Sequence, residues 1–136
     1  MKARLRISRK HSAASIRKLR KSNLRSSAGI RGLTVFSFTR ISPNTFVYTT
    51  SFTVARLFNT GEVIVSQRPA TGSTAIPTVR YQFVNAITNV PVTNFVTVSG
   101  TRISVLRFVL PPGTFKLKIT NVGSGPVEVE GVILVF

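Results

Sequence analysis

The sequence predicts an all-β fold, an antiparallel β-sandwich of eight strands that follows a basic N-terminal arm. After Gly32 the chain is rich in Val, Ile, Phe and Thr, and turn residues recur about every eight to twelve positions. No segment of this part repeats apolar residues with a helical period, so a parallel sheet with helical crossovers is excluded. Together these observations favour a sandwich or barrel of short antiparallel strands.

The strands are placed between clusters of Pro, Gly, Asn and Ser, which are the residues that turns require. Apolar and polar residues alternate most clearly in the second, fourth and seventh segments, which predicts one buried face for each. We expect strands at residues 33–40, 46–58, 62–68, 78–86, 91–98, 102–110, 114–120 and 127–136.

The charges of the last two predicted strands suggest how they pair. A hairpin closed by the loop 121–125 brings Lys118 opposite Glu128 on the solvent-facing side. The same register brings Lys116 opposite Glu130, whereas a slip of one residue would bring each lysine opposite a valine. We therefore expect two exposed ion pairs in a hairpin, which leaves no catalytic role for either glutamate.

The C-terminal segment 131–136 is a continuous apolar run. Such a run is typical of a strand that is covered on both faces. We expect it to be a central strand of the sandwich, and the alternative is that a neighbouring subunit covers it.

The basic residues are concentrated at the N-terminus. Residues 1–31 hold eleven Lys and Arg with no acid, whereas residues 32–136 hold eight basic residues and all three Glu. We therefore divide the chain into a basic arm, 1–31, and a sandwich domain, 32–136. The arm is expected to be extended or partly helical, with a short helix over 12–21 that forms only against a partner. Its basic residues are Lys2, Arg4, Arg6, Arg9, Lys10, Arg17, Lys18, Arg20, Lys21, Arg25 and Arg31.

The composition argues against an enzyme. The chain has no Cys and no Asp, and its single imidazole, His11, lies among the cations of the arm. Catalytic triads, zinc sites and carboxylate cages all need residues that are missing or too few. We therefore expect no catalytic, cofactor-binding or metal-binding residues, no secretory signal and no membrane span.

The phenylalanines of the body do not alternate with Lys or Arg along the sequence, as a stacking platform for single strands would require. We expect them in the core or in an interface; they include Phe36, Phe38, Phe58, Phe95 and Phe108. The arm then has two interpretations. It neutralises phosphates, or it docks on a neighbouring subunit.

An eight-stranded, Thr/Val-rich body with a protruding basic arm resembles two families of small jelly-roll proteins. The first is the coat proteins of simple viruses, including satellite viruses, in which such arms bind the genome. The second is the subunits of bacterial spore appendages and related spore-surface proteins, in which N-terminal connectors dock on the next subunit. The segments 111–115 and 119–131 are similar to the closing hairpin of the second family, although the cysteines that cross-link some of its members are missing.

These resemblances imply a non-enzymatic structural subunit that assembles in many copies. The leading expectation is a filament or surface layer on a spore or cell, held together by the arm. The alternative is the coat protein of a virion, whose arm binds and packages RNA or DNA. A carbohydrate-binding sandwich is disfavoured, because the chain has no Trp and only two Tyr.

Overall fold

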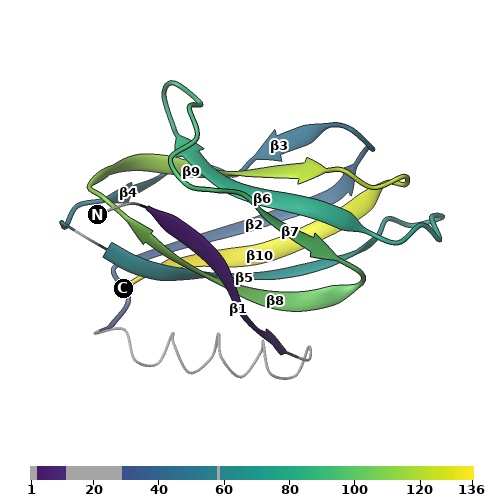
Figure 1. Ribbon diagram of the computed structural model, residues 1–136, viewed down its shortest axis with the longest axis horizontal. Coiled ribbons are helices and arrows are strands. Elements are labelled where there is room, and N and C mark those ends of the chain that lie inside the picture. The colour runs from purple at the N-terminus through teal and green to yellow at the C-terminus, as the bar shows by residue number, and fades with distance from the viewer. Residues whose placement is uncertain (1–2, 12–28, 58) are drawn as a thin grey trace.

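The computed structural model describes residues 3–11, 29–57 and 59–136, which form strands in two antiparallel sheets (Figure 1). The predicted all-β class is confirmed. The strands are β1 (Arg4–His11), β2 (Gly32–Ile41), β3 (Phe46–Tyr48), β4 (Phe52–Val54), β5 (Asn59–Pro69), β6 (Thr78–Asn85), β7 (Val96–Ser99), β8 (Arg102–Leu110), β9 (Gly113–Asn121) and β10 (Val127–Val135).

The two sheets are built from strands that are mostly distant in the sequence. Sheet A has the order β1-β8-β5-β10-β2, and sheet B has the order β3-β9-β6-β7, with β4 also paired to β9. From β2 onward the chain passes back and forth between the sheets, so β6 and β7 are the only consecutive strands that pair among the described residues. The predicted segment 46–58 is divided into β3 and β4, and β1 comes from the arm.

The core lies between the sheets and is rich in aromatic side chains. Phe83 of β6 is fully buried, and its ring centroid lies 4.7 Å from that of Phe108 on β8 and 5.7 Å from that of Phe52 on β4. Because side chains alternate along a strand, each sheet supplies one apolar face to this core. The aromatic cluster therefore joins the two sheets across the core.

A buried polar network also crosses between the sheets. The Tyr81 hydroxyl donates a hydrogen bond of 2.8 Å to Oε1 of Gln67, and both side chains are buried. Nε2 of Gln67 donates to the carbonyls of Val98 and Gly100. Burial raises the pKa of the Tyr81 phenol well above its usual value, so this hydroxyl stays protonated as a donor.

The predicted hairpin of the last two strands is wrong. β9 lies in sheet B, where it pairs with β3, β4 and β6, whereas β10 lies in sheet A between β5 and β2. The loop between them therefore carries the chain from one sheet to the other. Buried Asn121 holds this crossing, because its Nδ2 donates to the carbonyls of Ile41 and Gly125. Charge matching found a consistent register but could not identify the partner strand.

The four residues of the predicted hairpin ion pairs are consequently separated. Glu128 accepts hydrogen bonds from Arg68 of β5 at 2.7 and 3.0 Å. Glu130 lies opposite Ser66 and Ser37 in the register of sheet A. Lys116 and Lys118 are on sheet B, where they lie over aromatic rings. The Arg68–Glu128 pair thus replaces the predicted pairing.

The Arg68–Glu128 pair makes stability depend on pH in the acid range. Hydrogen bonding from Arg68 lowers the pKa of Glu128 below its ordinary value near 4.5 and raises the pKa of Arg68. The stabilisation is therefore complete above pH 4.5 and is lost as the pH falls through the lowered pKa of the folded state. We expect the melting temperature of the parent to exceed that of Glu128→Gln at pH 7, with the difference vanishing in acid. Glu130→Gln is the control, and an equal pH dependence in both variants would contradict the assignment.

The expectation of a central C-terminal strand is confirmed, because β10 lies between β5 and β2. Ile133 and Val135 face the core. Val132 and Leu134 face the other side of sheet A and are also buried, in a second apolar cluster with Ile64 and Val105. The continuous apolar run therefore reflects burial on both faces of this strand.

The first part of the arm is a strand of sheet A rather than a free extension. β1 pairs with β8 along its length, and the Leu5 side chain is 1% exposed in the main core. The Asn94 side chain holds Leu5 from both directions, accepting from its N–H at 3.2 Å and donating to its carbonyl at 3.0 Å. Residues 4–11 thus belong to the sandwich, and the predicted helix over 12–21 lies outside the described residues.

Candidate polyanion-binding face

Three arginines meet on the outer side of sheet A. Arg4 and Arg6 of β1 are exposed, because Leu5 between them points into the core. Arg6 lies opposite Arg107 of β8, and Arg107 lies opposite Glu62 of β5. The alternation of three neighbouring strands therefore places one row of charged side chains across the sheet.

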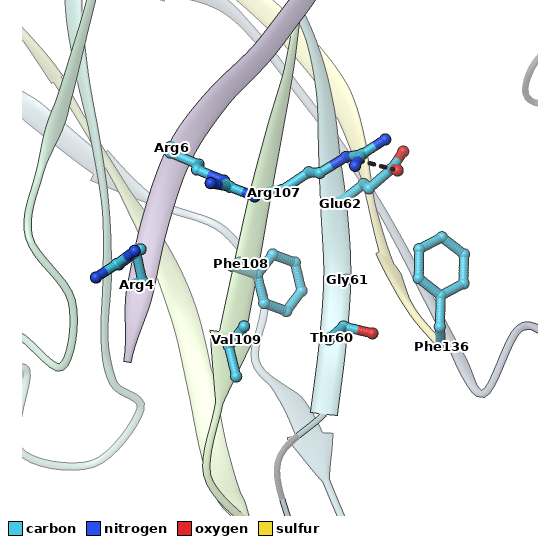
Figure 2. A pocket seen from close by; sticks show the side chains of 9 residues that line it. All are labelled: Arg4, Arg6, Thr60, Gly61, Glu62, Arg107, Phe108, Val109 and Phe136. Carbon is cyan, nitrogen blue, oxygen red and sulfur yellow. Dashed lines mark ion pairs between the residues drawn. The ribbon is translucent and has the colours of Figure 1, made fainter. Parts of the chain in front are cut away.

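One ion pair anchors this row. The Arg107 Nε lies 3.5 Å from Oε1 of Glu62, and the Arg107 side chain is 51% exposed (Figure 2). Glu62 is the one acidic side chain among the residues that line the hollow, beside three arginines, so the side chains there carry a net positive charge. The pair orients Arg107; in Figure 2 the Arg6 side chain extends from β1 toward Arg107, whereas the Arg4 side chain points to the opposite side of β1.

The arginines line an open hollow of about 690 Å³. Gly61 is one of its lining residues, and an added Cβ there would overlap the Phe108 ring and the Leu134 carbonyl, so only glycine fits. Beyond β5 the hollow is bordered by Phe136, whose N–H donates to the Thr60 carbonyl at 3.0 Å (Figure 2). Its lining residues are Arg4, Arg6, Thr60, Gly61, Glu62, Arg107, Phe108, Val109 and Phe136.

This arrangement is suited to binding anions. Guanidinium groups remain charged at all physiological pH values and present planar sets of N–H donors that match phosphate oxygens. A volume of several hundred Å³ is typical of sites that enclose a small ligand. Three arginines around an open hollow can therefore bind phosphate groups of a polymer that passes along the face.

The predicted arm residues lie in different parts of the structure. Arg4 and Arg6 contribute to the hollow, and Arg31 is exposed beside β10, where its N–H donates to the Val135 carbonyl. Three further arm residues lie along β1, opposite successive residues of β8, namely Arg9, Lys10 and His11. The remaining predicted residues lie outside the described part of the chain, namely Lys2, Arg17, Lys18, Arg20, Lys21 and Arg25.

Arg107 and Phe136 were not predicted as site residues. Arg107 interrupts an apolar strand between Leu106 and Phe108, both of which are buried, and this alternation indicates that it faces outward. The sequence does not indicate which arm residue lies beside it. That neighbour follows from the pairing of β1 with β8, which are about a hundred residues apart.

Two further observations concern the described residues alone. No cluster of three His, Cys, Asp or Glu lies close enough together there to hold a metal ion. In the part of the chain that the structure describes, no helix has the length and hydropathy that a membrane crossing requires.

Comparisons with protein-family models, with curated proteins and with solved structures find no match to this chain.

Proposed function

We propose that this chain is a jelly-roll coat subunit that assembles in many copies into a virion and packages nucleic acid. The strand order supports the jelly-roll assignment. With β3 and β4 counted as one strand and β1 set aside, sheet A contains the first, eighth, third and sixth strands. Sheet B contains the second, seventh, fourth and fifth, and together they have the order of a double Greek key.

The position of β1 in sheet A of its own subunit favours this function over a filament joined by the arm. Leu5 is buried in the core of its own subunit, and Asn94 of the same chain bonds both its N–H and its carbonyl. A connector formed by residues 4–11 would have to release these contacts. In its present place β1 instead brings Arg6 opposite Arg107 and Arg4 opposite Val109, so that both arm arginines line the same hollow as Arg107.

The observation that carries the proposal is that Arg4 and Arg6 of the arm line the same hollow as Arg107 of the body. The arm supplies eleven basic residues without an acid, and Arg107 extends the positive charge onto the sandwich. Binding that neutralises phosphates does not depend on base sequence and weakens steeply with salt. A coat protein that packages a whole genome needs binding of this kind.

The first test is whether purified particles contain nucleic acid. We expect negative-stain microscopy to show closed shells and the absorbance ratio at 260 and 280 nm to show bound nucleic acid. Fibres without nucleic acid would instead support the filament, and a pure-protein spectrum from closed shells would contradict packaging.

The second test is the salt dependence of binding to a single-stranded oligonucleotide. We expect the variant Arg4→Gln/Arg6→Gln/Arg107→Gln to flatten the slope of log K against log salt by about 2, since each phosphate contact contributes about 0.7. The matched control removes the same charge elsewhere, at Arg40, Arg56 and Arg102. An equal loss of slope in both triple variants would show that the hollow has no special role.

A further inference from the structure

The outer face of sheet B carries three aromatic–cation pairs. The Lys118 Nζ lies 4.3 Å from the ring centroid of Phe46, and the Lys116 Nζ lies 4.1 Å from that of Tyr48. A third pair is formed by Arg80, whose Cζ lies 4.5 Å from the ring centroid of Phe95. Phe95, which the sequence places in the core or an interface, is therefore a surface residue, with half of its area exposed.

The pairing register places these groups across neighbouring strands. Tyr48 of β3 lies opposite Lys118 of β9, and Phe46 lies opposite Thr120, which in turn faces Arg80 of β6. The rings of Phe46 and Tyr48 also touch edge to face, with centroids 5.3 Å apart. The aromatic and cationic side chains are thus interleaved in space, although they are not interleaved along the sequence.

No carboxylate side chain lies on this face. The whole chain contains three glutamates and no aspartate, and all three glutamates lie on β5 and β10 of sheet A. The lysines and the arginine of sheet B are therefore positioned by rings rather than by ion pairs with acids. Such pairs remain attractive to an external anion, because their charge is not neutralised.

We infer that the outer face of sheet B binds single-stranded nucleic acid, with Phe46, Tyr48 and Phe95 stacking on bases and Lys116, Lys118 and Arg80 contacting phosphates. Base stacking on aromatic side chains combined with a positive surface is the general mode of binding to single strands. Bases of a duplex are stacked within the helix and cannot reach the rings. The inference rests on the proposed function for the class of polymer, but it uses the other sheet and a different chemistry.

An acidic polysaccharide is the competing ligand for such a face. Its sulfates or carboxylates would meet the cations, but its puckered sugar rings would contact Phe46 and Phe95 only through C–H groups, whereas the flat π-face of a base stacks directly on an aromatic ring. Both rings are 50% exposed, so about half of each remains accessible to a ligand. The exposed rings therefore favour nucleic acid.

The test changes the rings and leaves the charge unchanged. We expect Phe46→Leu/Phe95→Leu to weaken binding to an oligothymidylate by about 5-fold or more for each ring, as measured by fluorescence anisotropy after purification in high salt. Binding to inorganic polyphosphate, which has charge but no bases, should be unchanged. Phe46→Tyr/Phe95→Tyr, which keeps both rings, should retain the parent affinity.

Each other outcome overturns the inference. An unchanged affinity for oligothymidylate means that the rings serve packing alone. An equal loss of affinity for polyphosphate in the leucine variant means that the effect is electrostatic. A loss of affinity for dextran sulfate alone, an acidic polysaccharide, assigns the face to polysaccharides. A parent that binds no oligothymidylate would contradict the proposed function as well. The inference alone would be contradicted if the parent binds oligothymidylate, if its salt dependence changes in the triple variant of Arg4, Arg6 and Arg107, and if its affinity does not change when the rings are removed.

Discussion

Phe83→Ala will lower the free energy of unfolding by about 3–5 kcal/mol, the range measured when a large buried aromatic residue is truncated in a core. The Phe83 ring is fully buried between the sheets and packs against Phe108 of sheet A and Phe52 of sheet B. Removing it leaves a cavity that the strands on both sides cannot close, because their backbones are held by their own ladders.

The measurement is urea unfolding followed by far-UV circular dichroism, in salt high enough to release bound nucleic acid. Phe95→Ala is the matched control, because the same side chain is truncated at a position that is half exposed. We expect Phe95→Ala to lower the free energy of unfolding much less than Phe83→Ala does. Equal destabilisation by the two variants would mean that Phe83 is not at the centre of the core.

Leu5→Ala will destabilise β1 by about 2–5 kcal/mol, the cost of truncating a buried leucine. Among the residues Arg4–Ile7 of β1, whose side chains the structure describes, Leu5 is the one that enters the core, and Asn94 bonds both its N–H and its carbonyl. Because β1 is at the edge of sheet A, the loss will appear first as opening of this strand rather than unfolding of the whole domain.

Amide hydrogen exchange distinguishes these events, since opening of β1 exposes the amides of β1 and β8 alone. Ile7→Ala is the control, because Ile7 lies on the same strand but is 41% exposed. If the amides of β1 and β8 exchange at the parent's rate in both variants, the Leu5 side chain does not hold β1 in the core as the structure indicates. If Leu5→Ala opens β1, binding to single strands should also weaken, because Arg4 and Arg6 leave the hollow.

The two proposed binding faces use different physical principles. On sheet A, Arg4, Arg6 and Arg107 line a hollow, and in the proposal their guanidinium groups donate to phosphates. On sheet B, cations lie over rings such as Phe46 and Phe95, so charge and stacking act together. Substitutions of charge alone and of rings alone therefore separate the contributions of the two faces.

Much of the local structure follows from the amino-acid pattern. Alternation in 114–120 predicted which side chains of β9 face the core, and Leu117 and Ile119 are fully buried. The apolar run 131–136 predicted a strand covered on both faces, and β10 is central in sheet A. These features could be predicted because side-chain direction in a strand depends only on parity along the chain.

Alternation does not specify the partner of a strand. β9 and β10 carry complementary charges and adjoin in the sequence, yet they lie in different sheets, and Glu128 pairs with Arg68 instead of a lysine. Either pairing buries the inner faces of the two strands, so the local pattern fits both. The choice depends on how all the strands together enclose one core, which is a property of the whole chain.

The N-terminal segment illustrates the same division. Its concentration of basic residues is evident from the sequence, and so is the scarcity of acids in the rest of the chain. That Leu5 makes its first part a strand, and that Arg6 then lies beside Arg107, follows from the pairing of β1 with β8. Composition thus set the charge of this protein, whereas tertiary pairing decided where that charge gathers, because contacts between distant segments form only when the core closes around them.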